Sequence, residues 1–192
     1  MPQSTDFPLP PNLPEPLDDG AAKHLPGMAM PRVSLPSTAG SFVDVSKLTA
    51  PTTVFYCYPM TGVPGKPLPE GWDLIPGARG CTPQTCGFRG RHQQLTELNT
   101  RVYGVSTQST EYQREMVRRL NVPFEILSDC EFKLCDALRL PTLEVNKVRL
   151  MKRITLIVRV GRIVHVFYPV FPPDKSAEAV LDWLKAHPIW RA

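Results

Sequence analysis

Two cysteines five positions apart form the part of the sequence best suited to chemistry. Residues 80–90 read Gly-Cys-Thr-Pro-Gln-Thr-Cys-Gly-Phe-Arg-Gly and contain Cys81 and Cys86. Such a pair can bind a metal ion, form a structural disulfide or carry out redox chemistry. The chain has five cysteines, an odd number, and its N-terminus shows neither the basic nor the apolar region of a signal peptide. We therefore expect a reducing, cytoplasmic compartment, in which structural disulfides are rare.

The cysteine pair falls where a helix is predicted to begin. Pro83 suits the first helical turn, because its missing N–H group would have no partner there. A thiol at this place faces unpaired N–H groups and the positive end of the helix dipole, which favour the reactive thiolate. In an intact helix the Cα atoms of Cys81 and Cys86 lie about 8–9 Å apart, whereas a disulfide needs less than about 7 Å. A bond between them requires the first turn to unwind, which suits a redox-active pair better than a structural disulfide.

Hydrophobic periodicity predicts a domain in which strands and helices alternate. Short apolar runs rich in β-branched and aromatic residues predict buried strands, and apolar residues three or four positions apart predict helices. This order predicts an α/β fold with a central mixed β-sheet flanked by helices on both faces. The predicted strands are 52–58, 101–106, 154–158 and 163–168; the predicted helical stripes are Phe88–His92–Leu95–Leu98, Tyr112–Met116–Leu120 and Ala177–Val180–Leu181–Leu184, with a short helix at 131–138.

Proline and glycine divide the chain into regions. Nine of the 22 prolines lie before residue 37, and residues 1–26 are predicted to form an extended segment. Residues 27–192 are predicted to form one domain with a long loop at 60–80. Because the loop joins the first buried strand to the cysteine helix, we expect it to fold over the thiol pocket, with Trp72 packed down. The alternative is that this apolar loop forms a subunit interface.

The net charge of +4 by itself excludes few classes of binding partner. Seven basic residues between Arg139 and Arg162 are accompanied by a single acid, Glu144. No nucleic-acid recognition motif accompanies them, so we interpret them as solvated surface and predict no nucleic-acid partner. No apolar run has the length that spans a bilayer, and we predict no membrane association.

Six segments of the chain follow one another in the order and spacing of a known family. They are VSLPSTAGSFVDVSKL, TVFYCYP, GCTPQTCGFRG, YGVST, ILSD and KRITLIVRVGRIVHVF, within residues 27–187. Together they resemble the peroxiredoxins, and most closely the bacterioferritin-comigratory, or PrxQ, group. The resemblance implies a thioredoxin-like fold and a thiol-dependent peroxidase that needs no metal or flavin cofactor. It also implies hydrogen peroxide or organic hydroperoxides as substrates, thioredoxin or glutaredoxin as the reductant, and a monomer or weak dimer.

The same resemblance implies roles for three residues. Cys81 matches the peroxidatic cysteine, which attacks the peroxide and becomes a sulfenic acid. Cys86 matches the resolving cysteine, which forms an intramolecular disulfide with it. Arg153, in an Arg-x-Thr sequence before a strand, matches the arginine that stabilises the thiolate and the peroxide.

The chain departs from the family pattern around the first cysteine. Pro59 lies 22 residues before Cys81 instead of seven, and Ala78 replaces the threonine or serine expected three positions before the cysteine. Thr61 and Thr82 are the candidates to supply the missing hydroxyl. Two aromatic residues are further candidates for the pocket wall, namely Tyr56 and Trp72.

Alternatives stay open for the function and for the other cysteines. With Ala78 in place of a hydroxyl, a redox-sensing or binding module with little turnover is the alternative to a peroxidase. Cys130 and Cys135 repeat the spacing of the first pair, so the four thiols together could form a zinc site, but zinc ligands usually lie closer together in sequence. We therefore predict that Cys135 lies on the buried face of a short helix and that Cys57 belongs to the core. Gln84 stands where many members of the group carry glutamate.

Overall fold

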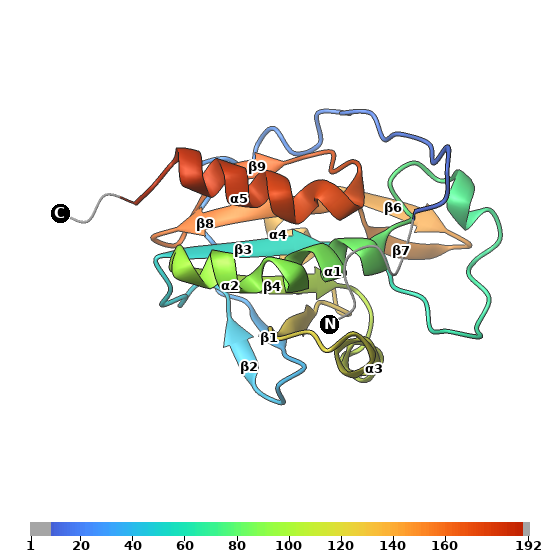
Figure 1. Ribbon diagram of the computed structural model, residues 1–192, viewed down its shortest axis with the longest axis horizontal. Helices are drawn as coiled ribbons and strands as arrows, with labels where there is room; N and C mark the ends of the chain where they lie inside the picture. Colours follow the sequence, from blue (N-terminus) through green and yellow to red (C-terminus); the bar gives the residue numbers. More distant parts are fainter. Residues whose placement is uncertain (1–8, 190–192) are drawn as a thin grey trace.

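A five-stranded mixed sheet forms the centre of the computed structural model, which describes residues 9–189 (Figure 1). The strand order is β5-β4-β3-β8-β9. The first three of these are parallel, β8 is antiparallel to β3, and β9 is antiparallel to β8. The strands are β3 (Thr52–Cys57), β4 (Thr100–Ser106), β5 (Ile126–Ser128), β8 (Ile154–Arg159) and β9 (Arg162–Phe167).

Helices cover both faces of this sheet because alternate residues of its strands point to opposite sides. In β3, Val54 and Tyr56 pack on one side with α1, α2, α3 and α5. Phe55 and Cys57 pack on the other side with α4 and the N-terminal part of the chain. The predicted α/β fold is confirmed. The helices are α1 (Cys81–Gly90), α2 (His92–Glu97), α3 (Thr110–Leu120), α4 (Lys133–Leu138) and α5 (Ser176–Ala186). Within residues 9–189, none of the helices is long and apolar enough to cross a membrane.

The apolar stripe that predicts one helix from Phe88 to Leu98 belongs to two helices. The first ends at Gly90, and Arg91 has φ −107° and ψ 6°. The N–H of Arg91 is shared between the carbonyl groups of Gly87 and Phe88, at 3.3 Å from each. Glycine is a weak helix former, and the tightened turn around it interrupts the helix. The periodicity persists because both helices pack on the same face of the sheet.

Within residues 9–189, two hairpins and two short 3-10 helices lie outside the central sheet, and none of them was predicted from the sequence. In the second hairpin, Asn146 and Lys147 form a two-residue turn, and both have positive φ, 50° and 64°. Such turns are usually recognised by a glycine at the second position, and lysine in its place hides the signal. The elements are β1 (Ser34–Pro36) with β2 (Phe42–Asp44), β6 (Thr142–Val145) with β7 (Val148–Met151), η2 (Trp72–Leu74) and η3 (Pro173–Lys175).

The proline-rich N-terminal segment lies against the domain. Of the predicted extended segment 1–26, residues 1–8 lie outside the described residues. From residue 9 the chain runs from the start of α1 toward β9, drawn in dark blue in Figure 1. Leu25 is fully buried in the core on the α4 side of the sheet, and the ring of His24 bonds with the carbonyl of Leu138 at 2.9 Å. Packing against the domain thus begins before residue 27.

Candidate active site

The peroxidatic candidate Cys81 is the first residue of α1, as predicted from the position of Pro83. Gly80 precedes it with φ 103°, in the left-handed region that favours glycine. A Cβ atom at Gly80 would lie 2.3 Å from Cγ of Pro173 and 2.9 Å from Cδ2 of Leu9. Glycine therefore allows both the sharp entry into the helix and the close packing around the cysteine.

The guanidinium of Arg153 lies against the sulfur of Cys81. Its Nη2 donates to Sγ over 3.2 Å and to the carbonyl oxygens of Ala78 and Arg79 over 3.1 and 3.0 Å. Arg153 directly precedes β8 and is 3% exposed, and Cys81 is 4% exposed. A buried cation at hydrogen-bond distance stabilises negative charge on the sulfur.

Gln84 holds the other side of the same guanidinium. Its Oε1 accepts a short hydrogen bond from Nη1 of Arg153, and its Nε2 donates to Oγ of Ser176 over 3.2 Å. The hydroxyl groups of Ser176 and Thr155 are 3.5 Å apart. Connected buried polar groups restrict one another's orientation. Sequence reasoning missed this network because Gln84 and Ser176 are 92 positions apart and carry no shared local signal.

Cys86 lies on the same helix but faces the apolar core. It is 1% exposed and packs in the cluster that contains Tyr56 and Phe88. Cys81 and Cys86 are both thiols rather than a disulfide, and α1 is intact between them. Because an intact helix keeps residues with this spacing too far apart for a disulfide, the two sulfurs can bond only after the first turn of α1 has unwound.

A cavity of about 440 Å³ opens beside Cys81. One wall is the start of α1, with Thr82, and another is the long loop, with Thr61 and Trp72. Trp72 is almost completely buried and packs with Ala78 and the β6–β7 hairpin. The loop thus borders the thiol pocket, with its tryptophan packed down as expected.

Tyr56 was a candidate for the pocket wall, and the structure places it elsewhere. Its side chain is fully buried beneath α1, where the ring stacks on Phe88 with 4.4 Å between centroids. The hydroxyl donates to Oγ1 of Thr85 over 3.2 Å. Burial raises the pKa of the Tyr56 phenol well above its ordinary value. Tyr56 therefore supports α1 from below and does not line the cavity beside Cys81.

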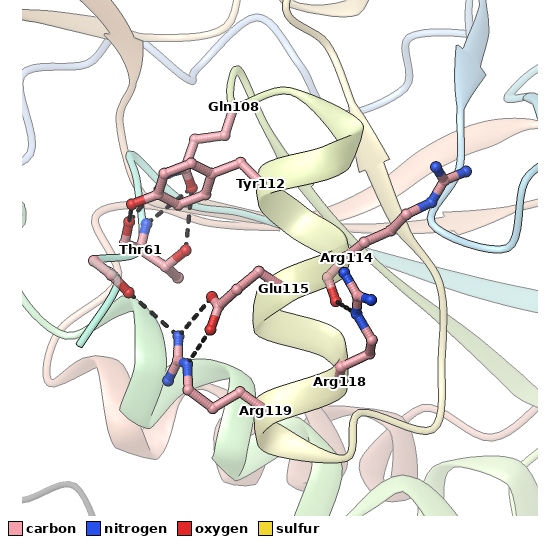
Figure 2. Close-up of polar contacts among 8 residues, drawn as sticks. Thr61, Gln108, Tyr112, Arg114, Glu115, Arg118 and Arg119 are labelled. Carbon is pink, nitrogen blue, oxygen red and sulfur yellow. Dashed lines mark hydrogen bonds and ion pairs between the residues drawn. The ribbon is translucent and has the colours of Figure 1, made fainter. Parts of the chain in front are cut away.

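Polar contacts tie the base of the long loop to α3 and to Gln108 in the turn before it, as Figure 2 shows. The side chain of Gln108 accepts from the N–H of Thr61 over 2.9 Å and donates to its carbonyl over 3.1 Å. The same carbonyl accepts from the hydroxyl of Tyr112 over 2.9 Å, and Arg119 donates to the carbonyl of Gly62 over 3.2 Å. The hydroxyl of Thr61 donates to Oε1 of Gln108 and is thus engaged in this anchor. Of the two threonine candidates, Thr82 is the one outside it.

The remaining cysteines have no place in the cavity. Cys57 and Cys135 are fully buried, as predicted, and burial raises the pKa of both thiols, that of Cys135 to about 12. Cys130 is exposed. Within residues 9–189, no group of three or more His, Cys, Asp or Glu side chains lies close enough together to hold a metal ion. The four cysteines considered for zinc therefore do not converge.

Thioredoxin-like thiol proteins have a mixed sheet of this topology. In them the first central strand is followed by a helix that carries a thiol at its N-terminus. Comparison with known families agrees with this class. Residues 25–181 match the Redoxin family. The chain belongs to that family.

Individual relatives point to one branch of thiol proteins. The chain is 29% identical over 158 residues to the peroxiredoxin Bcp of Bacillus subtilis, which covers 80% of this chain and 91% of that one. A mutant PrxQ of Xylella fastidiosa has a TM-score of 0.70 at 24% identity, over 85% of this chain and 98% of that one. The bacterioferritin comigratory protein of Xanthomonas campestris, from a structural study of its alkyl peroxide reduction activity, has a TM-score of 0.67 at 21% identity, over 82% and 91%. The resemblance to the PrxQ group and the thioredoxin-like fold are both confirmed.

Proposed function

We propose that this protein is a thiol-dependent peroxidase that reduces hydrogen peroxide or organic hydroperoxides at Cys81. One observation carries the proposal: the 3.2 Å contact between Nη2 of Arg153 and Sγ of Cys81, at a helix start that borders a cavity. Membership of the Redoxin family and similarity to named peroxiredoxins support it.

In the first step the thiolate of Cys81 attacks one oxygen of the peroxide. An S–O bond forms, the O–O bond breaks, and the departing oxygen takes up a proton and leaves as water or an alcohol. The sulfur is oxidised to a sulfenic acid. The guanidinium of Arg153 and the N–H groups of the first turn of α1 stabilise the negative charge that moves from sulfur to the departing oxygen.

In the second step the thiol of Cys86 attacks the sulfenic acid, releases water and forms the Cys81–Cys86 disulfide. This step follows the unwinding of the first turn of α1. An external dithiol, thioredoxin or glutaredoxin, then reduces the disulfide by thiol–disulfide exchange. We place this cycle in the cytoplasm, where such reductants keep thiols reduced, and in a monomer or weak dimer.

Peroxide consumption by the reduced protein tests the proposal. One equivalent of hydrogen peroxide should be consumed, and peptide mapping should then find a Cys81–Cys86 disulfide. Cys86→Ser should accumulate a sulfenic acid at Cys81 that dimedone traps, whereas Cys130→Ser, at an exposed position, should behave like the wild type. A Cys81→Ser variant that consumes peroxide at the wild-type rate would refute the assignment.

Ala78 favours a second candidate function. It is fully buried three positions before Cys81, and its methyl group brings no hydroxyl to the cavity. A peroxide that is poorly oriented reacts slowly, and the protein would then act as a redox sensor or binding module with little turnover. Oxidation of Cys81 without sustained turnover, in the presence of thioredoxin, glutaredoxin or dithiothreitol, would support this candidate over the peroxidase.

A further inference from the structure

The described N-terminal residues contribute to the wall of the Cys81 cavity. We call residues 9–19 the N-terminal strap. Leu9 and Pro10 at its beginning line the cavity together with Cys81 and Thr82. Cδ2 of Leu9 lies 2.9 Å from the position that a Cβ atom on Gly80 would occupy. The strap therefore packs directly on the residue that precedes the cysteine.

The other end of the strap is held by Lys152 and Tyr168. The carboxylate of Asp19 accepts from Nζ of Lys152 over 2.7 Å and from the hydroxyl of Tyr168 over 2.8 Å. The hydrogen bond from Lys152, followed by that from Tyr168, lowers the pKa of Asp19 to about 2, so the carboxylate is ionised under all ordinary conditions. Between its two ends, the strap passes over the long loop where Pro16 lies 3.4 Å from the position of a Cβ on Gly77.

The strap can detach from the domain surface without disrupting the central sheet. It lies outside every helix and strand of residues 9–189, and Leu17 within it is 84% exposed. Segments with few buried apolar contacts open locally at a small fraction of the global unfolding free energy. Its prolines restrict the unfolded chain, so the attached state costs little conformational entropy.

We propose that the N-terminal strap is a removable outer wall of the Cys81 cavity, which limits the size of the molecules that reach the thiol. Small molecules reach the sulfur with the strap in place, whereas bulky ones require Leu9 and Pro10 to move away. Because Leu9 packs on Gly80, the strap also restrains the first turn of α1, which must unwind before Cys81 and Cys86 can bond. The effect of the strap on peroxide selectivity rests on the proposed function, but its effect on access to the Cys81 thiol does not.

Alkylation of the reduced protein tests the size limit without any peroxidase activity. Iodoacetamide is the small reagent and N-(1-pyrenyl)maleimide the bulky one, with modification of Cys81 followed by peptide mass spectrometry. The exposed Cys130 is the reference thiol in the same molecule. Deletion of residues 1–12 removes Leu9 and Pro10 but leaves Asp19 in place. It should raise the rate at Cys81 relative to Cys130 by about tenfold for the maleimide, equivalent to about 1.4 kcal/mol of opening free energy, and much less for iodoacetamide.

Point variants distinguish the role of Leu9 in the cavity wall from other effects of deleting the segment. Leu9→Ala should reproduce part of the deletion effect, and Asp19→Asn should act in the same direction by releasing the far end. Leu17→Ala is the matched control, because this leucine lies on the same strap but not at the Cys81 cavity. Its two alkylation rates should equal those of the wild type.

The outcomes distinguish this proposal from the peroxidase assignment. In the deletion variant, the ratio of rates for cumene hydroperoxide and hydrogen peroxide should rise together with maleimide labelling. If maleimide labelling of Cys81 rises in the deletion variant but the protein has no peroxidase activity, the strap limits access as proposed and only the proposed function is refuted. Unchanged maleimide labelling in the deletion and Leu9→Ala variants, or an equal rise for both reagents, would overturn the size limit.

Discussion

Arg153 and Cys81 are separated by 72 positions in the sequence, yet Nη2 of the arginine donates to Sγ of the cysteine over 3.2 Å. The sheet brings them together. β3 and β8 are paired so that Cys57, the last residue of β3, lies opposite Ile154, the first residue of β8. Arg153 therefore lies at the end of the sheet from which the chain leaves toward Cys81.

The first prediction concerns this contact. Arg153→Met should lower the second-order rate constant for peroxide by about 10²–10³-fold, the usual effect of removing one preorganised donor. Stopped-flow measurement of Cys81 oxidation checks it. Arg32→Met, at an exposed arginine, is the matched control and should leave the rate unchanged. A rate constant that stays within a few-fold of the wild type would show that Arg153 has no part in the reaction.

Gln84 is predicted to position Arg153. Gln84→Leu leaves both Nη1 of Arg153 and the hydroxyl of Ser176 without this partner, which should cost about 1–3 kcal/mol of stability and lower the peroxide rate constant. Gln84→Glu retains an acceptor for the arginine and should restore much of the rate. Gln93→Leu on the exposed side of α2 is the control. Gln84→Leu with wild-type kinetics would limit the role of this side chain to packing.

Oxidation should unwind the start of α1. After formation of the Cys81–Cys86 disulfide, hydrogen exchange in the peptide 80–88 should become faster, because an intact first turn keeps the two sulfurs too far apart. The peptide covering α3 (Thr110–Leu120) should be unaffected. If the disulfide forms while protection of residues 80–88 is retained, the proposed coupling between chemistry and helix unwinding is wrong.

Trp72 is predicted to fasten the long loop over the cavity. Trp72→Ala should cost about 3–5 kcal/mol in local packing, as for other buried aromatic residues. Hydrogen exchange over residues 63–77 should increase, and the selectivity between hydrogen peroxide and cumene hydroperoxide should change. Leu74→Ala is the control, because Leu74 is 80% exposed two positions further along. Unchanged selectivity together with a changed sedimentation mass would identify the loop as a subunit interface.

The Asp19 contacts predict a pH dependence of stability. The pKa of Asp19 is lowered from 3.8 to about 2. The carboxylate therefore contributes fully to the free energy of unfolding at pH values above 3.8, and this contribution is lost as the pH falls through about 2. Asp19→Asn should therefore be less stable than the wild type in urea at pH 7. The two unfolding midpoints should converge as the pH falls from 4 toward 2. If the unfolding midpoints of the wild type and Asp19→Asn differ by the same amount at pH 4 and at pH 2, the contribution of Asp19 is not ionic.

The sequence by itself determined the features that depend on local order. Apolar runs rich in β-branched and aromatic residues predicted four strands of the central sheet and missed the three-residue β5 (Ile126–Ser128). The position of Pro83 placed Cys81 at a helix start, and the helix geometry showed that Cys81 and Cys86 cannot bond without unwinding. These inferences succeeded because each depends on residues within a few positions of one another. Local signals were less reliable where a single residue changes the backbone, as at Gly90, which splits one predicted helix into two.

The tertiary structure alone decided which side chains share the cavity. The direction of Tyr56 follows from the strand pleat, which points it under α1 and away from the pocket. Gln84 reaches Arg153 and Ser176 only because α1, β8 and α5 meet at one end of the sheet. Leu9 reaches Gly80 across about seventy positions of sequence. Contacts of this kind arise from packing between distant segments, and no periodicity or motif in the chain encodes them locally.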